Sequence, residues 1–484
     1  MVLIPSPARG RAMHLPSNRL LTHQVDALRR QFLQDGGLPF ADVLTADCLH
    51  EALGEIKSTW KDRVYNPLVT LWVFLAQVLN ADQSCRAAVA RLIAHRVSQG
   101  LEPCSSETGA YCQARKRLPE RFFAAVACLV GRNLDSRVDR RWLWKGRRVC
   151  LFDGSTVSMP DTEENRREYP LAYNQVPGTS FAPARIGAII SLSCGAILDL
   201  GVCRYAGKGQ GEVSLLRKLW DVLRPGDVLL DDRLMSGWVG MHLLKQRGVD
   251  TVSRLSAHRH ADFRKGTRLG KDDHLVVWKK PSSIRSVDRA TYHALPDAIT
   301  VREVRFRVEQ PGFRNRSVVV VTTILDPGQA SAEELASLYR ARWNNELDLR
   351  SIKVTLQMDV LRCKTPELVR KEIWAHVLAY NLIRTVMAQA ATIEGVEPRS
   401  ISFKATLQVL EAFRPLIAYR AHCGADCQEE LYEQLLGAIA VHRVADRPDR
   451  FEPRMTRKGP RGYEELKRPR REIKLQMLKR ASKI

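Results

Sequence analysis

Residues 339–353 read YRARWNNELDLRSIK and place a tyrosine, an arginine, a glutamate and a lysine at offsets of 0, 3, 7 and 14. A helix advances about 100° per residue, so Tyr339, Arg342, Glu346 and Lys353 return to nearly one face. A carboxylate on that face can bind a metal ion, and its neighbours can bind phosphates. A solvated helix face with mixed charges is the competing interpretation of this stripe.

Two strand-like segments earlier in the chain lead into acidic residues. Residues 148–154 read RVCLFDG, a buried strand ending at Asp153, and residues 227–232 read DVLLDD, another buried strand ending in acid. Phosphodiester cleavage needs two metal ions about 3.5–4 Å apart, and hard divalent cations prefer oxygen ligands. Three carboxylates brought together from distant segments suffice for such a site. Asp231 and Asp232 face opposite ways on a strand, so at this point either can be the second ligand.

The composition points to a nucleic-acid partner. The 484 residues include 76 Lys and Arg against 53 Asp and Glu, a formal net charge of +23. Such an excess favours a polyanion. An anionic membrane is the competing partner, but the longest apolar run, Leu68–Leu79, is well short of the roughly 20 residues of a membrane span. Eleven scattered cysteines without a CxxC pair favour a reducing cytosol and argue against a disulfide framework or a zinc knuckle.

Changes in sequence texture divide the chain into five predicted parts. These are residues 1–140 as a helical N-terminal DNA-binding domain, 146–256 as the first part of a mixed α/β core, 257–328 as an all-β insertion, 329–395 as the second part of the core, and 396–484 as a helical region with a basic tail. Ser331 and Glu334 form a capping-box pattern that predicts a helix start. The basic tail is expected to contact phosphates.

A basic helix is predicted in the N-terminal part. Ser105-Ser106-Glu107 can cap a helix that carries Tyr111 and the run Arg115, Lys116 and Arg117. Such a helix could enter a DNA groove and read its sequence. An ordinary amphipathic surface helix is an equal alternative.

These motifs together resemble the DDE transposases of the insertion-sequence-four family from bacterial mobile elements. Residues 339–353 match the family's Y-(2)-R-(3)-E-(6)-K motif without a gap. The segment 226–234, GDVLLDDRL, is similar to the family's apolar strand ending in Asp-Arg. Further similarity occurs at 380–384, at 402–404 and in the basic tail around 447–450. The resemblance covers about residues 40 to 470.

The resemblance implies a fold, a reaction and a set of residues. It implies an RNase H-like core interrupted by a β-rich insertion, a helical N-terminal domain for terminal inverted repeats, and cut-and-paste transposition by a dimer through nicking, hairpin formation and strand transfer. It also implies two Mg²⁺ ions per active site, with Mn²⁺ as a substitute. The implied catalytic metal ligands are Asp153, Asp232 and Glu346, with Asp232 preferred to Asp231 because Arg233 follows it.

The expected DNA contacts are Tyr339, Arg342, Lys353, Arg233, Trp278, Arg115, Lys116 and Arg117. Trp278 is included because family members use a tryptophan of the insertion to stack a flipped base, and stacking on an aromatic ring is worth roughly 1–3 kcal/mol per base. A packed core tryptophan is the alternative.

Two other functions stay open. One is an RNase H-like nuclease that cuts DNA without joining it, against which the complete Tyr-Arg-Glu-Lys motif argues. The other is a decayed copy that only binds DNA, against which the intact acids and the uninterrupted frame argue. We therefore predict an active transposase of the cytoplasm, associated with the nucleoid and with double-stranded DNA.

Overall fold

The computed structural model describes residues 52–54, 63–98, 100–173, 175, 177–282, 284, 287–307, 317–419, 425–444 and 468–481. The first 51 residues of the predicted N-terminal domain and the segment around 447–450 lie outside the described residues. The described chain is mixed α/β, as expected. Among its helices, none combines the length and the apolar character needed to cross a membrane.

The described strands form one mixed sheet in the order β3-β2-β1-β4-β5-β9-β8-β7-β6. Their bounds are β1 Val149–Met159, β2 Ala182–Ser191, β3 Ile197–Arg204, β4 Val228–Asp231, β5 Asp250–Arg254, β6 Thr267–Gly270, β7 Asp273–Lys279, β8 Ala298–Arg307 and β9 Ser317–Thr322. β1 runs antiparallel to β2 and parallel to β4, and β4 runs parallel to β5.

The sheet differs from the predicted strands in three ways. β1 does not end at Asp153 but continues to Met159, because its second half stays paired with β2. β5 was not anticipated from the sequence. The insertion is not all β, since it contains helix α10 (Arg289–Ala294), and its strand β9 pairs with β5, which makes the insertion an extension of the core sheet.

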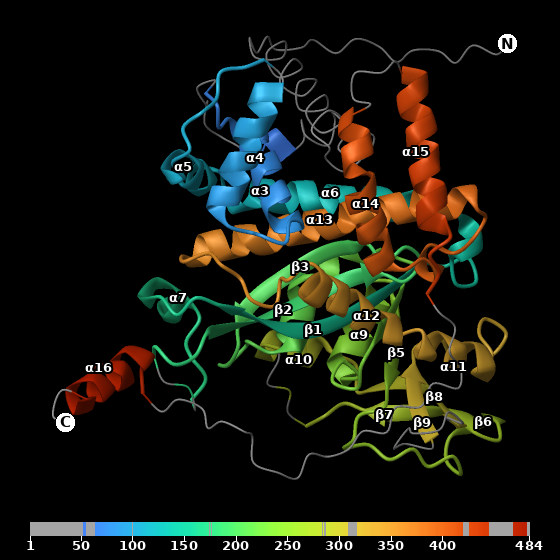
Figure 1. The fold of residues 1–484 in the computed structure, drawn as a ribbon. Helices are drawn as coiled ribbons and strands as arrows, with labels where there is room; N and C mark the ends of the chain where they lie inside the picture. Colours follow the sequence, from blue (N-terminus) through green and yellow to red (C-terminus); the bar gives the residue numbers. More distant parts are fainter. Residues whose placement is uncertain are drawn as a thin grey trace, which may run out of the picture.

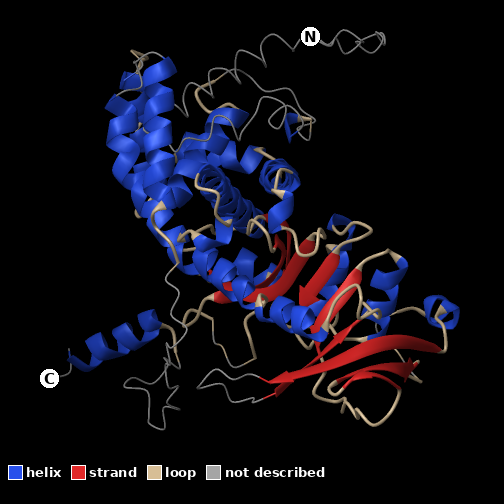
Figure 2. Cartoon of the chain, turned by 90° about the vertical axis from the view of Figure 1, so that its right-hand side faces the viewer, coloured by secondary structure: helices blue, strands red, loops and turns tan. Residues whose placement is uncertain are grey.

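Helices cover both faces of the sheet's first half (Figure 1 and Figure 2). One face carries α3 Pro67–Leu79, α4 Cys85–Ser98, α5 Gly109–Arg117, α6 Glu120–Ser136, α13 Pro366–Ile393, α14 Phe403–Tyr419 and α15 Ala425–Ala440. The opposite face carries α8 Glu212–Lys218 and α9 Trp238–Gln246, whose apolar side chains pack on the strands. The short α7 Glu163–Glu168 and the C-terminal α16 Arg470–Ala481 lie at the periphery.

The long helix α13 is the centre of the helical layer. It packs against α3, α6 and α15 and against strand β3. Its apolar side chains share one hydrophobic cluster with α3, α6 and the sheet. Each Å² of apolar surface removed from water contributes about 25 cal/mol to folding. The shared cluster is therefore the main contribution to the stability of the folded chain. The N-terminal helices and the second part of the predicted core are therefore packed as one unit around α13.

Local sequence signals decide several helix ends. Asn66 caps α3 by accepting the Val69 N–H, with Pro67 in the first turn. Ser331 and Glu334 form the predicted capping box at the start of α11 (Ala332–Arg340). The expected cap at Ser105-Ser106-Glu107 is wrong: Ser105 accepts the Glu107 N–H within a bend, and α5 begins only at Gly109.

Candidate active site

Asp153, near the middle of β1, lies next to Asp232, the residue that follows β4. In this parallel pair Leu151 is opposite Leu230, so two further residues bring Asp153 level with Asp232. Neighbouring strands are about 4.8 Å apart, and alternate residues share a face. Both aspartates therefore share the face of Leu151 and Leu230, which belong to the cluster under the helical layer.

Asp231 lies on the opposite face of the sheet. It alternates with Asp232 and so shares the face of Leu229, which packs with α8 and α9. Asp231 is fully buried there, and this burial raises the pKa of its carboxyl group well above the usual value. The two adjacent acids are thus in different environments.

The predicted stripe from Tyr339 to Lys353 is not one α-helix. Helix α11 ends at Arg340, α12 covers Trp343–Arg350, and a π-helical turn follows at Ser351–Thr355. At the break, the Asn344 side chain donates to the Ala341 carbonyl at 2.9 Å and competes with the regular backbone pattern. A uniform rotation of about 100° per residue therefore does not predict which side chains share a face beyond Ala341. Helix α12 nevertheless packs on β1, the strand of Asp153.

Arg342, at this break, lies among the three predicted acids. Its Nη2 is 3.5 Å from Glu346 Oε1. Burial disfavours the charged guanidinium, but Tyr339, Asp232, Asp153 and Glu346 outweigh burial and raise the pKa of Arg342. The guanidinium thus neutralises part of the negative charge at this end of the sheet.

Burial makes the ionisation of Asp153 unfavourable. Burial raises the pKa of Asp153 to about 6, against the opposing effects of the Gly154 N–H and Arg342. The charges of Glu212 and Asp232 raise it further. Glu212, which was not predicted, approaches because Gly154 has no side chain: a Cβ there would lie 2.4 Å from Glu212 Cγ. Glu212 is itself paired with Arg185 at 2.8 Å, and only the three-dimensional packing could reveal its proximity to Asp153.

Tyr339 and Lys353 flank the acids. Tyr339 is buried against Phe306, with ring centroids 6.3 Å apart. Burial raises the pKa of Tyr339 to about 12, although the nearby Arg342 and Arg254 lower it. Lys353 Nζ donates to Ser155 Oγ at 2.9 Å, two residues beyond Asp153 on the same face of β1.

Arg254 is a basic residue that the sequence analysis missed. Ser253 is opposite Asp231 in the parallel β4–β5 pair, so Arg254 is level with Asp232. Asp153, Asp232 and Arg254 therefore follow one another across three neighbouring strands. The available signal was an arginine at the end of a β-branched segment, but β5 itself was not expected.

The donor set fits a hard divalent cation only in part. Asp153 and Asp232 supply neighbouring carboxylate oxygens, the ligands that Mg²⁺ and Mn²⁺ prefer. Glu346 is paired with Arg342, and its side chain is 44% exposed. Within the described part of the chain, no three His, Cys, Asp or Glu side chains are close enough together to hold a metal ion.

Two predicted DNA contacts are corrected by burial. Arg115 is 4% exposed, because its guanidinium lies over the Phe74 and Tyr111 rings at 4.9 and 4.6 Å in the helical core. Trp278 is also 4% exposed, and its Nε1 donates to Glu303 Oε1 at 3.0 Å. Trp278 is therefore a packed core tryptophan, as the alternative interpretation expected.

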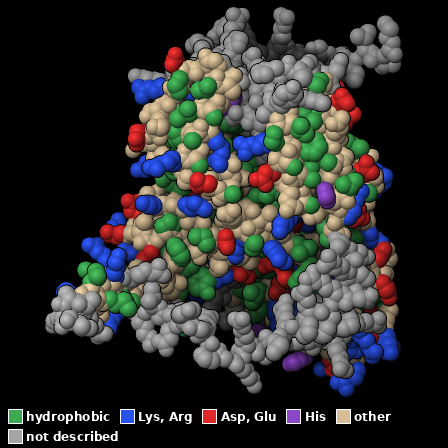
Figure 3. Space-filling view, in the orientation of Figure 1, with side chains coloured by type: hydrophobic (Ala, Val, Ile, Leu, Met, Phe, Trp, Pro, Cys, Tyr) green, Lys and Arg blue, Asp and Glu red, His purple; other side chains and the backbone are tan. Residues whose placement is uncertain are grey.

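Three predicted contacts outside the Tyr339–Lys353 stripe stay accessible. Lys116 and Arg117 are exposed at the end of α5, and Arg233 is half-buried just after Asp232. On the face drawn in Figure 3, lysine and arginine side chains lie over both the helical layer and the sheet, interspersed with acidic ones. The basic character of this face is therefore spread over several elements.

Comparison with known proteins agrees with the geometry. Residues 144–382 match the family described as "Transposase DDE domain". Over 463 residues the chain is 25% identical to the transposase InsG for insertion sequence element IS4 of Escherichia coli K12, covering 93% of this chain and 98% of the relative. A segment of 69 residues is 41% identical to the transposase for insertion sequence element IS421 of Escherichia coli, covering 14% of this chain and 19% of the relative.

A cryo-EM structure of a piggyBac transposase synaptic complex with hairpin DNA aligns with 86% of this chain and 85% of that chain, at 8% identity. Its TM-score of 0.42 is too low to establish a common fold. The matched domain contains Asp153, Asp232 and Glu346, and the alignment to the IS4 relative runs almost end to end. The chain is therefore a DDE transposase, and it is similar to the transposase of IS4 along almost its whole length.

Proposed function

We propose that this transposase cuts DNA at the terminal inverted repeats of its own element and joins the freed ends to target DNA, with Asp153, Asp232 and Glu346 as the metal-binding acids. The observation that carries this proposal is the shared face of Asp153 and Asp232 on neighbouring parallel strands, next to the helix of Glu346. The burial of Asp231 on the opposite face supports Asp232 as the second ligand.

The strand arrangement supports an RNase H-like core. Strands β3, β2 and β1 are antiparallel, and β4 and β5 continue parallel to β1. We assign residues 146–256 and 329–395 to this core, 257–328 to the insertion, 1–140 to the DNA-binding helical domain and 396–484 to the C-terminal region. The active sites and DNA ends are brought together by a dimer in this proposal.

Glu346 completes the metal site by leaving Arg342. A pair of Mg²⁺ ions, or Mn²⁺ in their place, would activate the attacking oxygen and stabilise the leaving one. A DNA phosphate can replace Glu346 as the partner of Arg342, because a guanidinium binds phosphate through two parallel hydrogen bonds. Glu346, at 3.5 Å from Arg342 and 44% exposed, would then be free to join Asp153 and Asp232.

The DNA backbone follows the basic residues around these acids. Tyr339, Arg342 and Lys353 hold the phosphates flanking the scissile bond, with Arg233 and Arg254 on the adjoining strands. Lys116 and Arg117 add contacts from the helical layer. Neutralisation of phosphates supplies most of the affinity and makes it salt-dependent. Binding to the host chromosome places the protein at the nucleoid.

The test uses duplexes that carry the ends of the element. Asp153→Ala, Asp232→Ala and Glu346→Ala are expected to slow cleavage by roughly 10³-fold or more, equivalent to about 4 kcal/mol of barrier. Gel-shift affinity is expected to stay within about twofold, because phosphate contacts supply it.

Asp231→Ala is the control, since this residue faces away from the site. Cleavage that survives in Asp232→Ala and is lost in Asp231→Ala would overturn the assignment of the second ligand. A strand-transfer assay on the wild-type chain separates a transposase from a nuclease, because only the transposase joins the cut end to a second duplex.

A further inference from the structure

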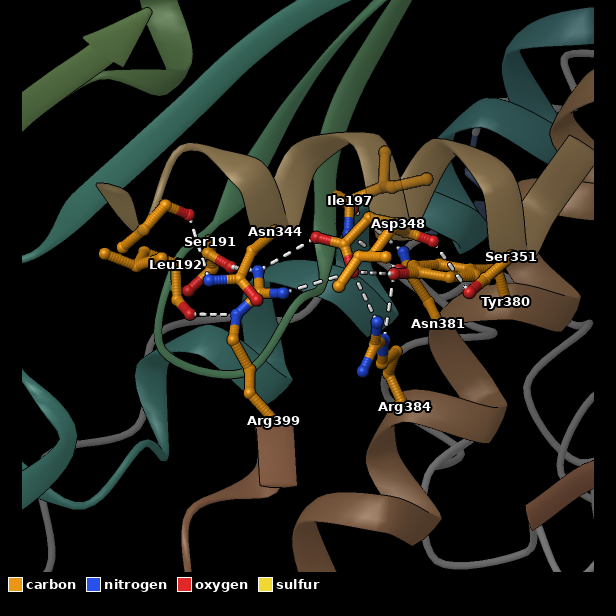
Figure 4. Close-up of polar contacts among 12 residues, drawn as sticks. Ser191, Leu192, Ile197, Asn344, Asp348, Ser351, Tyr380, Asn381, Arg384 and Arg399 are labelled. Carbon is orange, nitrogen blue, oxygen red and sulfur yellow. Dashed lines mark hydrogen bonds and ion pairs between the residues drawn. The ribbon is translucent and has the colours of Figure 1, made fainter. Parts of the chain in front are cut away.

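A buried carboxylate lies close to Glu346 on the same helix. Asp348 is two residues further along α12, which places it about 200° around the helix from Glu346. Its side chain is completely buried. It accepts hydrogen bonds from Tyr380 Oη at 3.0 Å and from Arg399 Nη1 and Nη2 at 3.1 and 2.9 Å, and it is paired with Arg384 (Figure 4).

The partners of Asp348 come from separate elements. Tyr380 and Arg384 are on α13, where Arg384 Nε donates to Tyr380 Oη at 2.8 Å. Arg399 is in the short turn Pro398–Ser400, and it also donates to the carbonyls of Ser191, at 2.8 Å, and Leu192 at the end of β2. We call Asp348, Tyr380, Arg384 and Arg399 the Asp348 network.

This network connects the helix of Glu346 to the strands of the aspartates. Ser191 on β2 is paired with Cys150 on β1, three residues before Asp153. One chain of polar contacts therefore runs from α12 through Arg399 to β2 and so to β1. The third acid and the first acid are held in one frame although they are almost 200 residues apart in the sequence.

Besides this network, α12 packs on β1 and buries Asn345 and Leu349. It has only eight residues, follows the break at Arg342 and leads directly into a π-helical turn. Its side chains Trp343 and Leu347 are exposed. An isolated helix of this length is unstable in water, so tertiary contacts must decide its position.

Stability alone is a poor reason for such a network. One carboxylate is buried with two guanidinium groups, and a buried ion pair often stabilises less than apolar side chains of the same volume. Buried ionic groups are better explained where they specify one arrangement among several. The directional contacts of Asp348 meet that description.

We infer that Asp348, Arg384 and Arg399 are positioning residues that orient α12 so that Glu346 can join Asp153 and Asp232 around the metal ions. The inference rests on the proposed metal role of Glu346. It predicts that the Asp348 network sets the metal affinity of the site through Glu346 and contributes nothing to DNA affinity.

The test is calorimetric titration of the full chain with Mn²⁺ alone. Asp348→Asn is expected to weaken Mn²⁺ binding about tenfold or more, the usual effect of residues that orient a ligand. In a chain that already carries Glu346→Gln, adding Asp348→Asn should change the Mn²⁺ affinity by less than about twofold. The reason is that Asp348 affects Mn²⁺ binding only through the position of Glu346. Gel-shift affinity for the element's ends should not change.

A charge-matched variant guards against misfolding of Asp348→Asn. The double variant Asp348→Asn/Arg399→Gln leaves one net positive charge in the network, as in the wild-type chain, yet still cuts the connection between α12 and β2. It is expected to show the same weakened Mn²⁺ binding. Asp135→Asn, which breaks the 2.6 Å pair with Arg148 near the start of β1, is the control and should bind Mn²⁺ as the wild type does.

The outcomes separate the two proposals. If Glu346→Gln weakens Mn²⁺ binding but the folded Asp348 variants do not, the inference is overturned and the proposed function stands. If Asp348→Asn weakens binding equally with and without Glu346→Gln, or if Asp135→Asn has the same effect, the network acts on general stability and the inference is also overturned. If Glu346→Gln binds Mn²⁺ like the wild type, the metal role of Glu346 fails first and the inference fails with it.

Discussion

The buried carboxylates of the insertion differ in their partners from the two aspartates of the candidate active site. In the insertion, Asp273 holds Arg302 with two hydrogen bonds of 2.8 and 2.6 Å, and Glu303 accepts from Trp278 while it contacts His274 at 3.0 Å. On β1 and just after β4, Asp153 and Asp232 lie side by side, and both interact with Arg342. The buried acids of the insertion each have a hydrogen-bonded partner of their own, whereas these two aspartates share the charge of Arg342.

This difference separates structural from functional charge. A buried carboxylate with its own arginine is part of the fold, and removing it leaves the arginine unpaired in an apolar environment. A carboxylate whose ionisation is disfavoured by burial is under electrostatic strain, which a bound metal ion would relieve. Substitutions at the two places should therefore change stability in opposite directions.

The largest effect on stability is expected in the insertion. Asp273→Asn leaves the fully buried Arg302 without its carboxylate and should lower the free energy of unfolding by about 3–5 kcal/mol. Urea denaturation measures this loss. Asp272→Asn is the matched control, because its pair with Arg305 is exposed and such pairs contribute about 0–1 kcal/mol. Equal losses in the two variants would show that the insertion does not depend on its buried pair.

The opposite sign is expected at Asp153. Its folded pKa of about 6 lies above the usual 3.8, so the folded state prefers the protonated acid and ionisation destabilises it. Asp153→Asn should therefore raise the free energy of unfolding at pH 7–8, by about 1–3 kcal/mol. This gain is complete above pH 6 and disappears as the pH falls from 6 to about 4. Denaturation curves at pH 8 and pH 4 test it, and a loss of stability at pH 8 would contradict the picture of strained charge.

The smallest effect is expected from a change that keeps the charge. Arg342→Lys retains a cation among the acids but loses the fork that binds phosphate, so single-turnover cleavage should slow about tenfold, or about 1.4 kcal/mol. Stability should change by less than about 0.5 kcal/mol. Arg302→Lys is the comparison, since its fork is buried in the fold and its loss should appear in stability. Cleavage at the wild-type rate in Arg342→Lys would show that the basic residues of the Tyr339–Lys353 stripe only form a solvated helix face.

Local sequence patterns predicted the elements that short-range interactions control. The Ser331-Glu334 pattern marked a helix start, because a cap involves residues three positions apart. The apolar runs before Asp153 and Asp231 identified β1 and β4, since a buried parallel strand is apolar on both faces. These patterns predict the same local structure in any tertiary context.

Features that depend on distant partners could not be predicted in this way. β5 and its Arg254 were missed, and β1 was predicted too short, because strand limits depend on the pairing partner. Arg115 was expected to contact DNA, and for Trp278 the sequence left base stacking and core packing open, yet both side chains find partners inside. A long side chain follows whichever environment the fold provides.

The amino-acid sequence alone identified the chemistry of the candidate site: three acids, their order along the chain and the motif around Glu346. Tertiary structure was needed to assign faces, since only strand register puts Asp232 beside Asp153 and turns Asp231 away. It was also needed to find the Asp348 network, whose members come from α12, α13 and the turn at Pro398–Ser400. The physical reason is that residue type and spacing encode local geometry and chemistry, whereas burial and charge compensation arise only when distant segments share one core.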